Sequence, residues 1–180
     1  MAELTAKDVM KLRNSTGLAM MECKKALIEA DGDPEKAETI LRLQLKGKMD
    51  KRTERAAADG CIAVATGGNS IVLAEVRAET DFTAKNERFA NAAQKVAELA
   101  LEAADGAVTP TDAMTALIDD VRIPTGENCS TARIQKFTSG GQFGYYVHHD
   151  GKPAAMLEDA GTSGPAWPRH VGMHATAALP

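Results

Sequence analysis

The sequence predicts an α+β protein: a small N-terminal helical module followed by a core domain of antiparallel hairpins packed against helices. Apolar residues recur at spacings of three and four over residues 1–45, which is the period of a helix face. After residue 60 they gather in short β-rich runs separated by turn sequences such as "GGN". A chain of 180 residues is long enough for such a module and one core domain.

The pattern over residues 1–45 predicts a module of three short helices with tight connections. Thr5 is the expected N-cap of the first helix, and Asp8 stands in the first turn, where a negative charge suits the helix dipole. Gly17 ends this helix. The third helix is expected to begin after Asp33, a second N-cap that is followed by a proline.

The second helix should be buried along one face and exposed along another. The residues that share the face expected to be buried are Met20, Cys23, Leu27 and Ala30. Met21 falls on another flank, near Lys24, and is our candidate for partner contact, because so small a module leaves some apolar surface available. The alternative is that Met20 and Met21 both fill gaps in the core, as methionine often does.

Residues 46–59 interrupt the helical period and predict a solvated basic linker. Its basic residues are Lys46, Lys48, Lys51, Arg52 and Arg55. RNA binding is the alternative, but no aromatic side chains are interleaved for base stacking. The formal net charge of −4 also argues against nucleic acid as the main partner, because coating nucleic acid needs a broad cationic surface.

The core is expected to hold two similar subdomains. Residues 60–139 predict strand, strand, helix, strand, with the long helix over 87–104 and the third strand over 130–138. Residues 140–180 begin a second round with "FGYYVHH", the turn "DGKP", the return strand "AAMLED" and a weaker helix. This second subdomain lacks a closing strand and is therefore expected to be incomplete.

No pattern predicts an enzyme, a cofactor or a resident metal. His170 and His174 have the spacing of a zinc-protease helix, but Val171 stands where that motif needs its glutamate. Three well-separated cysteines fit reduced thiols in a cytosol, and no signal peptide or membrane span is expected. We therefore expect a cytoplasmic protein without a membrane partner.

The stretch "AETDFTAKNERF" places Phe82 at a corner between a strand and a helix. Thr80 or Asp81 is expected to cap a short helical turn and Asn86 to cap the long helix. In one interpretation the segment is purely structural: the caps hold the turn, and Phe82 packs under the hairpin. The other is that the ring projects as a wedge, because Phe89 and several alanines already fill the inward face of the helix.

Two segments, "LRNSTGLAMMECKKAL" (12–27) and "EVRAETDFTAKN" (75–86), closely resemble the signature segments of the bacterial elongation factor Ts family. The shorter stretch "DGDPEKA" follows the first segment, "GEN" stands at 126–128, and "HVGMHATAALP" lies near the end of the sequence. The resemblance implies a non-enzymatic guanine-nucleotide exchange factor that binds the GDP-bound form of the GTPase elongation factor Tu. Members of this family continue well beyond a segment like residues 170–180.

The resemblance also implies roles for particular residues. The N-terminal module of the family is ubiquitin-associated-like and touches the GTPase domain, which corresponds here to Met20, Met21 and Lys24. The segment that dislodges magnesium from the GTPase corresponds to Thr80, Asp81, Phe82 and Thr83. The rival hypothesis is a degenerate or truncated relative that binds a partner as an adaptor and does not drive exchange.

Overall fold

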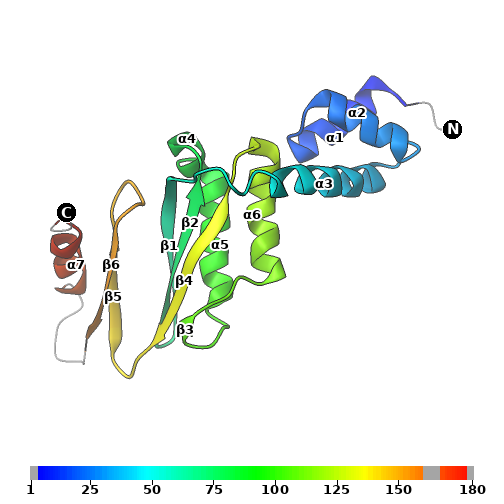
Figure 1. Ribbon diagram of the computed structural model, residues 1–180. Coiled ribbons are helices and arrows are strands. Elements are labelled where there is room, and N and C mark those ends of the chain that lie inside the picture. The colour runs from blue at the N-terminus through cyan, green and yellow to red at the C-terminus, as the bar shows by residue number, and fades with distance from the viewer. Residues whose placement is uncertain (1–3, 160–166, 178–180) are drawn as a thin grey trace. The chain divides into compact units, whose positions relative to one another are not determined.

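The computed structural model describes residues 4–159 and 167–177, and the chain forms two compact units (Figure 1). The first comprises residues 1–55 with 122–127, and the second comprises residues 56–121 with 128–180. Helices and antiparallel sheets are both present, which confirms the predicted α+β class.

The first unit contains the three predicted helices, α1 (Ala6–Thr16), α2 (Met20–Glu29) and α3 (Pro34–Asp50). The Thr5 side chain accepts a hydrogen bond from the backbone N–H of Asp8, and the Asp8 carboxylate accepts one from the backbone N–H of Thr5, which confirms the predicted capping box. Gly17 ends α1 with a φ of 73°, a left-handed conformation that glycine adopts without strain. Asp33 caps α3 as predicted.

Helix α3 corrects the predicted boundary between module and linker. The prediction ended the module at residue 45 and treated residues 46–59 as a linker, whereas residues 46–50 are helical. Met49 explains the difference, because it is only 5% exposed and extends the buried stripe of Leu41 and Leu45 by one more turn. The carboxylate of Asp50 then pairs with Arg122, at 2.6 Å.

The second unit contains a four-stranded antiparallel sheet in the order β1-β2-β4-β3. Its strands are β1 (Asp59–Gly67), β2 (Ser70–Ala78), β3 (Gly106–Ala107) and β4 (Ser130–Thr138). The β1–β2 hairpin and the strand over 130–138 confirm the prediction. The two-residue strand β3 was not predicted, because so short a segment carries no alternation of apolar and polar residues.

The helices α4 (Asp81–Ala84) and α5 (Glu87–Ala100) accompany this sheet, as does α6 (Asp112–Thr125) up to Val121, after which the chain belongs to the first unit. Phe89, Val96 and the alanines of α5 are buried against one face of the sheet, together with Met114 and Ile118 of α6. Helix α5 ends at Ala100 rather than at the predicted 104, and Lys136 on β4 donates hydrogen bonds to the carbonyl oxygens of Leu101 and Ala103 in the turn that follows.

The second predicted subdomain is a two-stranded antiparallel sheet, β5 (Gln142–Val147) and β6 (Ala154–Asp159), accompanied by α7 (Trp167–Ala177). Figure 1 shows α7 alongside this hairpin, and Gly172 of α7 lies directly against Tyr146 of β5. The strand–turn–strand–helix order agrees with the prediction. Among the described helices, none has the length and apolar character needed to cross a membrane.

Candidate functional site

Phe82 lies in the one-turn helix α4, which two successive caps hold between the sheet and α5. The Thr80 side chain accepts a hydrogen bond from the backbone N–H of Thr83 at 3.4 Å. The Asn86 side chain accepts one from the backbone N–H of Arg88 at 2.8 Å and starts α5. Both caps were predicted, with Thr80 rather than Asp81 capping the turn. The backbone on either side of Phe82 is therefore anchored.

The Phe82 ring is 84% exposed. The neighbouring side chains of Thr83 and Ala84 point into the fold and are at most 9% exposed, and Phe89 occupies the core. The interpretation that placed Phe82 under the hairpin is therefore wrong. Leaving a phenylalanine in water forgoes about 1.5 to 3 kcal/mol of burial free energy, so the fold alone gives no reason for a ring at this position.

The corner also carries a fixed negative charge. The Asp81 carboxylate accepts a hydrogen bond from the Lys85 ammonium at 2.8 Å, and this bond, with the attraction between the two charges, lowers the pKa of Asp81. Asp81 therefore stays ionised at neutral pH. An exposed aromatic ring beside a carboxylate suits contact with a protein surface that combines an apolar recess with donor groups.

The second predicted surface lies on α2. Met20 is 47% exposed and Met21 is 64% exposed, and Lys24 is also exposed. The prediction that Met20 lies on the buried face is wrong, and so is the alternative in which both methionines fill the core. Met20 is the first residue of α2, and Leu18 in the preceding connection is buried in the module core at this end of the helix.

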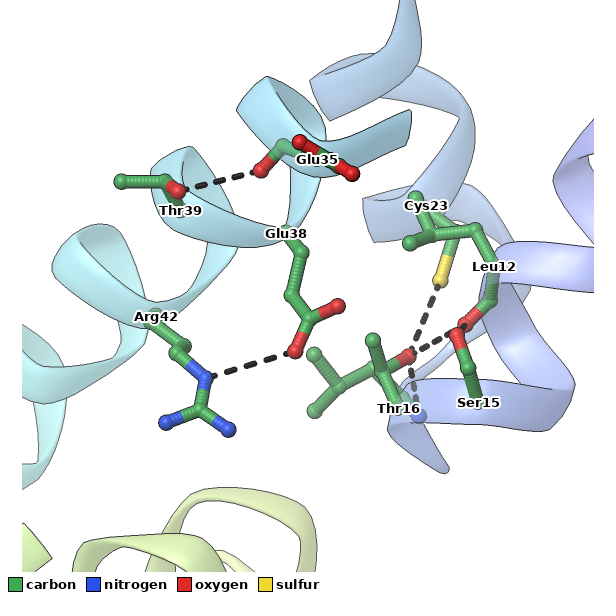
Figure 2. A network of polar contacts seen from close by, with 9 residues as sticks. Leu12, Ser15, Thr16, Cys23, Glu35, Glu38, Thr39 and Arg42 are labelled. Atoms are coloured by element: carbon green, nitrogen blue, oxygen red, sulfur yellow. Dashed lines mark hydrogen bonds and ion pairs between the residues drawn. The ribbon is translucent and has the colours of Figure 1, made fainter. Parts of the chain in front are cut away.

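Polar contacts fix the start of α2. Figure 2 shows the hydroxyl of Thr16 directed toward both Leu12 and Cys23: it donates to the Leu12 carbonyl oxygen at 2.7 Å and lies 3.9 Å from the Cys23 sulfur. Ser15 donates to the same carbonyl at 3.0 Å. These contacts hold the end of α1 against α2. They therefore fix the start of α2, where Met20 is the first helical residue.

The β5–β6 turn makes a long-range contact that the sequence did not predict. The turn between β5 and β6 lies against the start of β1, where the Lys152 ammonium and the Asp59 carboxylate are 2.5 Å apart. The residues are 93 positions apart, and periodicity within one element carries no information about such a pair.

Among the described residues, no group of three or more histidine, cysteine, aspartate or glutamate side chains could hold a metal ion. The spacing of His170 and His174 was rejected above as a zinc motif, and the side chain of His170 lies outside the described part of the chain. Cys61 is partly buried, and burial raises the pKa of its thiol to about 11, so the thiol is protonated at neutral pH.

The fold and the exposed groups together define an α+β protein that presents an anchored aromatic ring on its core and exposed methionines on a helical module. A family model described as "Elongation factor TS" matches residues 79–180. The chain is 41% identical over 185 residues to elongation factor Ts of Neisseria gonorrhoeae, 39% identical over 189 residues to that of Burkholderia multivorans, and 40% identical over 195 residues to that of Arthrospira platensis.

These matches show that the chain belongs to the elongation factor Ts family. The alignments with the three relatives each cover all of the chain. The chain spans 63% of the length of the Neisseria and Burkholderia relatives and 76% of the Arthrospira relative. Membership confirms the predicted family.

Proposed function

We propose that this chain is a guanine-nucleotide exchange factor that binds elongation factor Tu in its GDP-bound form and promotes release of GDP in the cytoplasm. The observation that carries the proposal is the Phe82 ring, 84% exposed on a turn with a cap on each side. Family membership supports the choice of partner. The action is non-covalent, so the chain needs no catalytic group of its own.

The proposed mechanism starts from how a GTPase holds GDP. Backbone amides around the phosphates and a bound Mg²⁺ retain the nucleotide, so GDP leaves slowly until that environment is distorted. Burying Phe82 in the partner would release about 1.5 to 3 kcal/mol. That free energy stabilises the distorted, magnesium-poor conformation relative to the GDP-bound one. Phe82, with Asp81 beside it, thereby displaces Mg²⁺, while Thr80 and the buried Thr83 hold the turn that presents them.

The N-terminal module would supply a second attachment. Met20, Met21 and Lys24 are exposed on one helix and combine apolar and basic groups, which suits an apolar partner surface edged by acidic residues. Attachment through the module makes insertion of Phe82 an intramolecular step with a high effective concentration. Coupling is reciprocal, so rebinding of nucleotide weakens the grip of the factor and completes the exchange.

Release of a fluorescent GDP analogue from elongation factor Tu, followed by stopped flow, tests the proposal. We expect the wild-type chain to accelerate release and Phe82→Ala to lose about tenfold or more of that acceleration, the factor that corresponds to 1.4 kcal/mol. Leu99→Ala is the matched control, because Leu99 is also an exposed apolar side chain of the second unit. Unchanged acceleration with Phe82→Ala would rule out the wedge.

GDP release, together with affinity measurements for elongation factor Tu and for RNA, separates the rival hypotheses. A wild-type chain that binds elongation factor Tu without accelerating GDP release would be an adaptor. A chain with no affinity for the GTPase, but with strongly salt-dependent affinity for RNA, would be an RNA-binding accessory that uses the basic residues between 46 and 55.

A further inference from the structure

The turn between β5 and β6 touches the first strand of the large sheet through both side-chain and backbone groups. The Lys152 ammonium lies 2.5 Å from the Asp59 carboxylate. The backbone N–H of Ile62 donates to the carbonyl oxygen of Gly151 at 2.7 Å. Gly151 has a φ of 72°, and a Cβ at this position would lie 3.4 Å from that of Cys61, so the turn approaches β1 closely. These contacts join the β5–β6 turn to the start of β1.

That place is also the end of the sheet from which the Phe82 turn emerges. Asp59, the first residue of β1, is paired across the hairpin with Ala78, the last residue of β2. Only Glu79 and Thr80 separate Ala78 from α4. The hydrogen bond and charge of Asp59 raise the pKa of Lys152, and the charges of Asp150 and then of Asp81, the residue before Phe82, add to the effect.

We propose that Lys152 is a positioning residue for Phe82: its ion pair with Asp59 ties the β5–β6 subdomain to the start of β1, which is paired with the end of β2 that carries the Phe82 turn. This inference rests on the proposed exchange function. An inserted ring displaces partner groups only if its own support does not yield, because any freedom left in the support must be lost in the productive complex. The tie makes both subdomains of the core part of that support.

The expected effect is modest, because the Lys152 and Asp59 side chains are 53% and 25% exposed. Ion pairs with this degree of exposure typically change an equilibrium by up to about fivefold. Loss of the tie should appear in the maximal rate of GDP release at saturating factor. The concentration that gives half of that rate should change little, because the N-terminal module keeps its own contacts with the partner.

Three variants and a control test the proposal in the full chain. Lys152→Met and Asp59→Asn each break the ion pair, and Lys152→Arg keeps the charge as a conservative replacement. Arg133→Met is the control, because it breaks an ion pair of 2.8 Å with Glu75 that is also on a strand of the second unit. The two readouts are stimulated release of a fluorescent GDP analogue and hydrogen exchange of the Ile62 amide in the free chain.

We expect Lys152→Met and Asp59→Asn to accelerate Ile62 exchange and to lower the maximal release rate about three- to fivefold. Combined, they should cause no further loss, because they remove the same contact. Lys152→Arg should restore most of the rate, and Arg133→Met should leave both readouts near wild type.

Ile62 exchange that is unchanged in Lys152→Met would show that the ion pair does not hold the turn. Faster Ile62 exchange with an unchanged release rate would make the pair purely structural, and an equal loss in Arg133→Met would make the effect nonspecific. A wild-type chain that fails to accelerate GDP release would remove both the proposed function and the positioning role, while Ile62 exchange would still report whether the tie exists.

Discussion

Asp81 and Lys85 form an ion pair of 2.8 Å that spans the single turn of α4, and Phe82 follows Asp81 directly. The Thr80 side chain caps the N-terminal end of α4, and the Asp81–Lys85 pair joins the first residue of α4 to the residue that follows its last one. A ring that is mostly in solvent is thus attached to a backbone with defined hydrogen bonds. Such pre-organisation lowers the entropic cost of inserting the side chain into a partner.

The ion pair predicts a measurable pH dependence. The Lys85 hydrogen bond and charge depress the pKa of Asp81, so the contribution of this carboxylate to stability is present above its unfolded pKa, about 3.9, and is lost as the pH falls through its lower folded pKa. An NMR titration of the Asp81 carboxyl should therefore give a midpoint below 3.9, a value that marks the ordinary aspartate range.

Lys85→Met should move that midpoint back toward the ordinary value. Asp33 is the internal control, because the backbone N–H of Lys36 is the main cause of its lowered pKa and the substitution leaves that bond intact. A midpoint for Asp81 that is the same with and without Lys85 would contradict the assigned cause.

The two caps around Phe82 should differ in strength. Asn86 accepts its hydrogen bond at 2.8 Å and Thr80 at 3.4 Å, and the shorter bond is the stronger. Asn86→Ala should lower the free energy of unfolding by about 1 kcal/mol and Thr80→Ala by about 0.5 kcal/mol, measured by urea denaturation. Thr80→Ser keeps the hydroxyl and serves as the control. The reverse order of the two alanine variants would contradict the geometric argument.

Local signals predicted much of this fold. The sequence alone predicts several helix ends, because each depends on residues within one turn. These are the N-caps at Thr5, Asp33 and Asn86 and the C-terminal glycine at position 17. The hairpins were predicted for the same reason, since strand alternation and turn residues are adjacent in the chain.

The exposure of individual side chains and the end of α3 depend on tertiary packing, which the sequence pattern does not show. Met20 fits the helix period of the buried face but is exposed, because burial depends on what packs against that end of α2. The exposure of Phe82 was equally open, because both interpretations satisfied the caps. The prediction ended α3 before residues 46–50, because most residues there are charged and Met49 is the one apolar side chain that continues the buried stripe.

Lys136 is expected to stabilise α5 through its C-terminus. Its ammonium donates to the carbonyl oxygens of Leu101 and Ala103 at 2.7 and 2.8 Å, just beyond the last turn, where a positive charge also complements the helix dipole. Lys136→Met should reduce the free energy of unfolding by about 1.5 to 3 kcal/mol, the range for hydrogen bonds to charged groups. Lys95→Met, on the exposed side of α5, should be within about 0.5 kcal/mol of wild type.

Stability and partner binding should depend on different residues of α2. Met21 is exposed, so Met21→Ala should change the free energy of unfolding by less than about 0.5 kcal/mol while weakening affinity for elongation factor Tu, measured by calorimetry. Leu27 is only 1% exposed, so Leu27→Ala should cost about 2 to 5 kcal/mol of stability. Affinity that is unaffected by Met21→Ala would remove Met21 from the proposed contact surface.

Two helical glycines predict opposite responses to the same substitution. Gly47 in α3 has nothing within 4 Å of an added Cβ, so Gly47→Ala should stabilise the module by about 0.5 to 1 kcal/mol through helix propensity alone. Gly172 in α7 has the Cβ of Tyr146 at 2.9 Å from an added Cβ, and that atom cannot rotate away. Overpacking typically costs about 1 to 3 kcal/mol, which exceeds the propensity gain, so Gly172→Ala should destabilise the packing of α7 on β5.

Hydrogen exchange distinguishes the two effects, because it reports each element separately. Gly47→Ala should slow exchange of α3 amides, and Gly172→Ala should accelerate exchange in α7 and β5. Slower exchange of α7 amides in Gly172→Ala would mean that the helix shifts away from Tyr146 at little cost. The double variant Gly172→Ala with Tyr146→Gly removes the clashing Cβ, so it should recover helix protection in α7 relative to Tyr146→Gly alone.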